Sequence, residues 1–238
     1  MHILTDFSQT KYQNAFTMAE VLITLGIIGI IAAMTLPGVF TDFRKRTTAE
    51  KLHQAYNFLQ QTFVMAQNEY GDMRNWECNI IERACTPEEF AQLYIIPYLK
   101  DTEIKTYRAL VNAGYKGYPK DLSGQTTMTG WRYYIRVKQG YLYMISYYDV
   151  LDGSRRVFNV AIDVNGPQAP NILGKDIFNM TYGYNISSKN HYKLQMYNYS
   201  NKSRYELLEE SCNKNSADNY CGAVIEMDGW QIKPDYPW

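Results

Sequence analysis

A single carboxylate, that of Glu20, stands at the head of an uncharged run from Val21 to Phe40. Twenty residues of α-helix rise about 30 Å, the thickness of the hydrocarbon core of a bilayer, so this run can cross a membrane. An ionised carboxylate at the edge of such a span costs free energy unless it pairs with a cation. Glu20 is therefore the residue with the clearest capacity for chemistry, and that chemistry is charge pairing at a membrane.

The residues from Ala15 to Ala33, AFTMAEVLITLGIIGIIAA, resemble the class III signal of type IV prepilins and type II secretion pseudopilins. The resemblance implies that a prepilin peptidase cleaves between Ala15 and Phe16 on the cytoplasmic side and methylates the new amine of Phe16. The family usually has Gly where this chain has Ala15, which is also small. The resemblance further implies that Glu20 pairs with the terminal amine of a neighbouring subunit. A carboxylate that only caps its own helix is the alternative.

An ordinary secretory signal or a plain membrane anchor is the rival interpretation of this segment. A secretory signal has an apolar region of about 7–15 residues followed by a small-residue cleavage site, whereas the run here is longer and no such site follows it. A plain anchor leaves Glu20 unexplained. The positive-inside rule argues the other way, because Arg44, Lys45 and Arg46 follow the span and the leader is weakly basic at best. The motif is given priority over that rule.

One helix is predicted to extend well beyond the span. Residues 41–68 contain no Gly or Pro, and their apolar residues recur with a period close to 3.6. Gly71 is expected to end the helix. The resemblance implies a role in assembly for Pro37, because a proline at this depth is common in the family. Pro37 should kink or locally melt the helix. The sequence thus predicts a leader over 1–15, a helix over 16–70 with its transmembrane segment at about 21–40, and a globular head over 71–238.

The chain is predicted to have an α+β, pilin-like fold, in which the long helix packs on an antiparallel sheet of the head. Strands are expected at 131–137, 141–149 and 156–163, joined by hairpin turns into a three-stranded meander. Capping boxes at Thr86 and Ser203 predict two short helices, and residues 101–130 are expected to form a loop. A final small hairpin is expected around Asp228-Gly229, and the tyrosines of the sheet are assigned to core and subunit packing rather than to a binding surface.

The four cysteines, Cys78, Cys85, Cys212 and Cys221, all follow the span. In the pilin orientation they lie outside the cytoplasm, where an even number of cysteines favours disulfides. Three pairings are open; the local pairs 78–85 and 212–221 are preferred because each closes a short polar loop. Metal binding is disfavoured, since the spacings are not C-x-x-C and no histidine is near.

Asp163, Asn165 and Asp176 place hard oxygen atoms in a loop rich in Gly and Pro. Ca²⁺ takes six to eight such oxygens, and the resemblance to major pseudopilins, which bind calcium in a nearby loop, points the same way. The EF-hand spacing is absent, and Asx side chains also cap turns without a metal. Turn capping is the preferred interpretation, Ca²⁺ the alternative, and no other cofactor is expected.

Charge and motifs restrict the function. The 238 residues carry 24 basic and 24 acidic side chains, so the chain has no overall charge that would attract nucleic acid. The sequence has no G-x-S-x-G, H-E-x-x-H, P-loop or dinucleotide-binding motif, and its three histidines are scattered, so no enzymatic activity is expected.

The resemblance implies a structural subunit of a type II secretion pseudopilus or a type IV pilus-like filament. Its expected partners are the prepilin peptidase, other pilin or pseudopilin subunits and the bacterial inner membrane, with nucleic acid only for a competence pilin. It would be single-pass with its head outside the cytoplasm, and then part of a periplasmic or extracellular filament. The alternatives are a minor tip pilin whose Tyr-rich head binds DNA, sugar or a surface, and an anchored receptor that does not polymerise.

Overall fold

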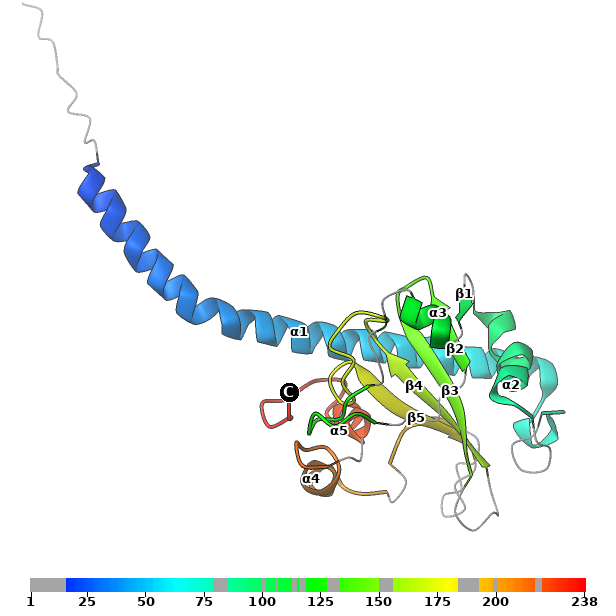
Figure 1. Ribbon diagram of the computed structural model, residues 1–238. Helices are drawn as coiled ribbons and strands as arrows, with labels where there is room; N and C mark the ends of the chain where they lie inside the picture. Colours follow the sequence, from blue (N-terminus) through cyan, green and yellow to red (C-terminus); the bar gives the residue numbers. More distant parts are fainter. Residues whose placement is uncertain are drawn as a thin grey trace, which may run out of the picture. The chain divides into compact units, whose positions relative to one another are not determined.

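The computed structural model describes residues 16–78, 85–99, 102–105, 107–112, 115, 119–127, 133–149, 156–183, 193–198, 201–216 and 220–238. By its contacts the chain divides into two compact units, Met1–Arg44 and Lys45–Trp238. The leader 1–15, including Ala15, lies outside the described residues. Figure 1 shows the elements of the second unit around a single sheet.

Helix α1 runs from Met18 to Tyr70, over 53 residues, which confirms the predicted long helix. It ends at Gly71, whose positive φ of 76° is a conformation that glycine adopts without strain. The helix is continuous through Pro37, so of the two predicted effects, a kink or local melting, the melting does not occur. Pro37 removes one backbone donor, but the flanking turns of this long helix keep their hydrogen bonds.

The head is built on a six-stranded antiparallel sheet in which every strand pairs with its neighbours in sequence, in the order β1-β2-β3-β4-β5-β6. The strands are β1 (Thr102–Lys105), β2 (Tyr133–Val137), β3 (Leu142–Asp149), β4 (Arg156–Asp163), β5 (Ile177–Gly183) and β6 (Lys193–Met196). The predicted three-stranded meander is confirmed as β2–β4. It was incomplete, because β1 on one side and β5 and β6 on the other extend it.

The part of α1 that belongs to the head packs on one face of this sheet (Figure 1). Leu52, Leu59 and Phe63 are fully buried there. Two tyrosine hydroxyls form hydrogen bonds between α1 and the sheet. The Tyr143 hydroxyl donates to the Ala55 carbonyl at 2.9 Å, and the Tyr56 hydroxyl donates to the Leu194 carbonyl at 3.0 Å. Tyr143, which the sequence assigned to the core, is therefore a core residue, and the hydroxyls of Tyr143 and Tyr56 are both hydrogen-bonded.

The opposite face of the sheet carries a smaller apolar cluster. Its members come from α3 (Tyr107–Asn112), the loop after it, strands β2–β5 and the loop between β4 and β5: Leu110, Tyr115, Tyr134, Leu142, Met144, Ala161, Leu173 and Ile177. Because β1 and α3 lie within 101–130, the expectation that this whole segment is a loop was wrong. The described residues thus form three layers: α1, the sheet, and the α3 cluster.

Further short helical elements belong to the head. Helix α2 (Pro87–Tyr94) begins at Thr86 and helix α4 (Arg204–Glu210) begins at Ser203, each with both bonds of the predicted capping box. The 3₁₀ turns η1 (Met73–Asn75) and η2 (Ile96–Tyr98) follow α1 and α2.

Helix α5 (Cys221–Met227) replaces the first strand of the predicted C-terminal hairpin, so that prediction was wrong. Asp228-Gly229 therefore follows a helix and does not turn a hairpin, and Gly229 adopts a φ of 68° there.

Candidate functional site

The start of α1 holds Glu20 in a capping box with Thr17. The Glu20 Oε2 atom accepts hydrogen bonds from the Thr17 backbone N–H and from the Thr17 hydroxyl, both at 2.8 Å. In return the Glu20 N–H donates to the Thr17 hydroxyl oxygen at 3.2 Å. The alternative weighed for Glu20, that it caps its own helix, is therefore part of its role. Both bonds fall on one oxygen, and the carboxylate retains a second oxygen that can accept from another group.

The apolar run after Glu20 is suited to lipid. Its threonine hydroxyls bond back to the helix: Thr24 donates to the Val21 carbonyl at 2.9 Å and Thr35 donates to the Ile31 carbonyl at 3.0 Å. The helix itself thus supplies the acceptors for these hydroxyls. A bilayer requires this, because lipid tails offer no hydrogen-bond partner. Within the described residues, α1 is the one helix long and apolar enough to span a membrane, and its apolar stretch is unburied.

The glycines of this run, Gly26, Gly29 and Gly38, have open surroundings. A Cβ built at any of them would meet no atom within 4 Å. In the single chain nothing requires glycine at these positions, and glycine costs an isolated helix about 1 kcal/mol relative to alanine. They leave room for another helix to approach closely.

Two disulfides stabilise the head, Cys78–Cys85 and Cys212–Cys221, and they are the two local pairs preferred from the sequence. The second joins the end of α4 to the start of α5. It also reaches the 163–176 loop, because a Cβ on Gly174 would lie 2.9 Å from the Cys221 Sγ atom.

The 163–176 loop gathers the oxygen atoms that the sequence singled out. Asp163 accepts from the Asn165 N–H at 3.1 Å, and Asp176 accepts from the N–H groups of Asn171 and Ile172 at 2.8 and 2.6 Å. These are the turn-capping bonds expected from Asx residues. The loop also contains a cis peptide bond between Ala169 and Pro170.

The same loop leaves buried oxygens without partners. They are Asp163 Oδ2, Asn165 Oδ1 and Asn171 Oδ1. Burial raises the pKa of the Asp163 carboxyl well above its usual range, and the nearby Asp176 carboxylate raises it further. Burial likewise raises the pKa of Asp176. Among the described residues no group of three or more His, Cys, Asp or Glu side chains could hold a metal, so any cation here would depend on the two carboxylates and the amide oxygens.

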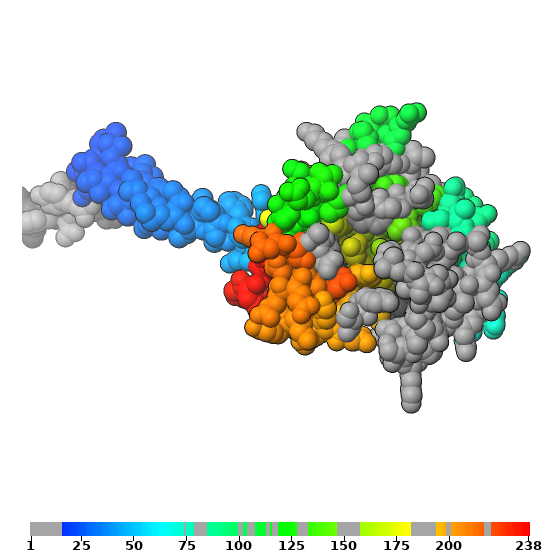
Figure 2. Space-filling view, turned by 60° about the horizontal axis from the view of Figure 1, so that its bottom comes forward, coloured from blue at the N-terminus to red at the C-terminus, as the bar shows by residue number. Residues whose placement is uncertain are grey.

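The C-terminal residues are tied to α4 by an ion-pair network. Arg204 at the start of α4 contacts the buried Asp228 carboxylate at 2.6 Å through Nε and holds Asp235 with both terminal nitrogens at 2.8 Å. Lys233 contacts Asp228 at 2.6 Å. In Figure 2 the C-terminal residues (red) lie against this part of the chain (orange).

The sequence did not predict the Arg204 network, although the Ser203 capping box places Arg204 at the first position of α4. Burial raises the pKa of Asp228, but bonds from Arg204 and Lys233 outweigh it and hold that pKa below its usual range. Trp230 stacks on His53 of α1, with ring centres 4.4 Å apart, so the C-terminal segment also reaches the long helix.

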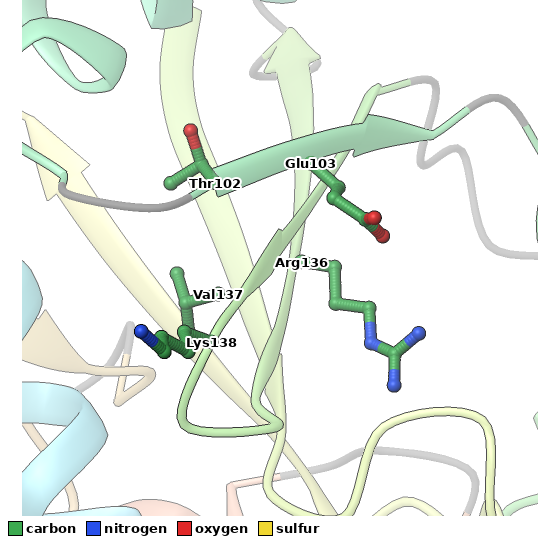
Figure 3. A pocket seen from close by; sticks show the side chains of 5 residues that line it. All are labelled: Thr102, Glu103, Arg136, Val137 and Lys138. Atoms are coloured by element: carbon green, nitrogen blue, oxygen red, sulfur yellow. The ribbon is translucent and has the colours of Figure 1, made fainter.

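A hollow of about 550 Å³ opens at the β1–β2 edge of the sheet (Figure 3). Its lining residues are Thr102, Glu103, Arg136, Val137 and Lys138. Figure 3 shows the Arg136 and Lys138 side chains pointing apart, so the two cations do not converge on one ligand. The Thr102 hydroxyl and the Glu103 carboxylate also point apart in Figure 3, so the lining does not pair a nucleophile with a base.

Comparison with known families agrees with this geometry. The prokaryotic N-terminal methylation motif matches residues 10–36. This match supports a prepilin-type processing signal at the N-terminus, and the packing of α1 on an antiparallel sheet is a pilin-like layout. A second family model, described as a family of unknown function (DUF6613), matches residues 39–238 and thus most of the chain; the protein belongs to that family. No curated protein and no solved structure matches the chain.

Proposed function

We propose that this protein is a structural subunit of a type II secretion pseudopilus or a type IV pilus-like filament. The observation that carries the proposal is the placement of Glu20 in the first turn of α1, within the methylation motif and four residues after Phe16. Cleavage before Phe16 would release a cationic amine at the membrane edge. A carboxylate with one oxygen uncommitted can then accept from the amine of a neighbouring subunit.

The open glycines and the unburied apolar half of α1 support the same proposal. Exposed apolar surface of this extent calls for a lipid or protein environment, and Gly26 and Gly29 would let neighbouring helices pack closely once subunits leave the bilayer. The work of such a subunit is mechanical: it polymerises and either pushes a secreted substrate or extends a pilus.

Filament assembly in cells that carry the peptidase tests this proposal. Glu20→Gln removes the charge while keeping the side-chain shape, and it should leave membrane insertion intact and lower the sheared or cross-linked filament fraction at least tenfold. Glu50→Gln is a matched control, because Glu50 is an exposed acid on the same helix. Normal assembly of Glu20→Gln would refute the pairing, and a chain that is inserted but never cleaved or polymerised would indicate an anchored receptor instead.

We also propose that the 163–176 loop can bind Ca²⁺. The supporting observation is the set of buried, unpartnered oxygens on Asp163, Asn165 and Asn171. The carboxylate of Asp176 adds a second acidic group to this set. A bound Ca²⁺ would supply positive charge that stabilises the ionised form of both carboxylates in this buried loop.

Thermal unfolding with added Ca²⁺ tests the loop site. A ligand present at a hundred times its Kd stabilises a protein by about 2.7 kcal/mol, so Tm should rise by about 5–10 °C in Ca²⁺ and not in Mg²⁺. Asp163→Asn should abolish the rise. An unchanged Tm of the parent protein in millimolar Ca²⁺ would exclude the site.

A further inference from the structure

Three consecutive cations, Arg44, Lys45 and Arg46, follow the apolar run of α1. The side chains of Arg44 and Arg46 are exposed and that of Lys45 is half-buried. Asp42 and Glu50 stand four residues before and after Arg46, the spacing at which helical ion pairs form. Among the described residues, however, none of the three cations forms an ion pair, so the cluster offers its charge to an external partner.

The depth of the cluster matches one partner. If the hydrocarbon core ends near Phe40, the helical rise places Arg44 about 6 Å and Arg46 about 9 Å beyond it. The polar headgroup layer occupies roughly 5–8 Å on each side of the core. Allowing for the length of the side chains, which can bend back toward the membrane, all three cations reach the phosphates of that layer.

The arrangement around the helix also favours lipid over protein. Successive residues are turned by about 100°, so three in a row cover roughly 200° of the helix circumference. A helix that docks on one protein partner presents residues at i, i+3, i+4 and i+7 along a single stripe. Charges spread around the axis at one depth suit a partner that surrounds the helix, which a bilayer does.

We propose that Arg44, Lys45 and Arg46 form a collar that binds the headgroups of anionic phospholipids. The collar would hold the outer end of the span at the membrane surface and set the depth of the subunit in the bilayer. It would also give a role to basic residues at the end of the span where the positive-inside rule does not expect them. The inference depends on membrane anchoring and not on filament assembly, so the two can fail separately.

Native mass spectrometry of the full chain in detergent, titrated with phosphatidylglycerol or phosphatidylcholine, tests the collar. Two net positive charges over residues 42–46 predict that the anionic lipid binds roughly thirtyfold more tightly. The triple variant Arg44→Gln, Lys45→Gln, Arg46→Gln should lose that preference. The charge-preserving pair Arg44→Lys, Arg46→Lys should keep it, because headgroup attraction depends on charge.

The matched control neutralises three exposed cations of the head, as Arg108→Gln, Lys120→Gln and Lys214→Gln. This control should retain the full preference, and inorganic phosphate at the same concentration should not compete. Raising the salt to about 1 M shortens the screening length from about 10 to about 3 Å and should erase the preference of the unaltered chain. Equal affinity for both lipids, a preference that survives 1 M salt, or salt-sensitive dimers in place of lipid adducts would each overturn the proposal.

Discussion

The Arg204 network gives a prediction whose size can be worked out from the structure. The Asp228 side chain is only 2% exposed, and its carboxylate is held by Arg204 and Lys233 at 2.6 Å each. Removing one partner of a buried ion pair costs about 3–5 kcal/mol. Lys233 remains in Arg204→Met, and the methionine fills part of the volume, so we expect a smaller loss of about 2 kcal/mol. The half-exposed Asp235 adds no more than about 0.5 kcal/mol.

Thermal unfolding of the full chain in detergent, followed by near-ultraviolet circular dichroism, measures this loss. For a domain of this size 1 kcal/mol shifts Tm by about 2–4 °C, so Arg204→Met should lower Tm by about 4–10 °C at pH 7. Lys214→Met, at an exposed site, should change it by less than 2 °C. A fall in Tm for Arg204→Met no greater than for Lys214→Met would refute the claim that Arg204 stabilises the C-terminal segment.

The pH dependence gives a second, independent check on the same network. The folded-state pKa values of Asp228 and Asp235 lie below their usual range, chiefly through bonds from Arg204 that offset the burial of Asp228. Their contribution is therefore present above the unfolded pKa of about 3.9 and is lost as pH falls through the lower folded values. The difference in Tm between parent and Arg204→Met should shrink as pH falls below about 4. A difference that stays constant with pH would contradict the ionic explanation.

Three further predictions test other parts of the structure. Phe63→Ala should cost about 3–5 kcal/mol, because Phe63 is buried between α1 and the sheet, whereas the exposed Val64→Ala should cost less than about 1 kcal/mol in urea unfolding. Gly174→Ala should destabilise by about 2 kcal/mol or more, because φ is +84° and the new Cβ would approach Cys221 Sγ to 2.9 Å; an unchanged Tm would disprove this packing. Gly29→Leu should leave the unfolding of the head unchanged yet reduce filament yield, and normal yield would remove the glycine from the assembly argument.

Local signals in the sequence were sufficient for several elements. The Thr86 and Ser203 capping boxes marked the starts of α2 and α4 correctly because the bonds involved span only three residues. Alternation of apolar residues identified β2–β4, and the 3.6 period identified the buried stripe of α1. Local spacing also favoured the disulfide pairs that form, since each closes a loop of fewer than ten residues.

Features that depend on distant residues were not predictable. Cys221–Met227 contains β-branched residues that favour a strand, but packing decides otherwise: a Cβ on Gly222 would lie 2.9 Å from Met196 Sδ, so the helix approaches β6 closely. Strand β1 carries charged residues and is defined by its pairing with β2. Strand β5 (Ile177–Gly183) was not predicted, because the sequence analysis placed the residues up to 178 in the oxygen-rich loop that begins at Asp163.

The candidate site likewise combines features that local sequence predicts with features that depend on the fold. The sequence located Phe16, Glu20 and the oxygen-rich loop, because a motif or a composition marks each of them. It could not show that Thr17 engages one oxygen of Glu20, or that Asp163 keeps an unpartnered oxygen in a fully buried position. Those facts depend on side-chain conformation and on which neighbours the fold supplies.

Mass spectrometry of the intact chain and of its N-terminal peptide, extracted from membranes of a host with an active prepilin peptidase, tests the central claim most directly. The account predicts a mature chain that begins at Phe16 and carries one added methyl group on its amine. A chain that still begins at Met1 in that host would contradict it, since Glu20 would then have no released amine to pair with.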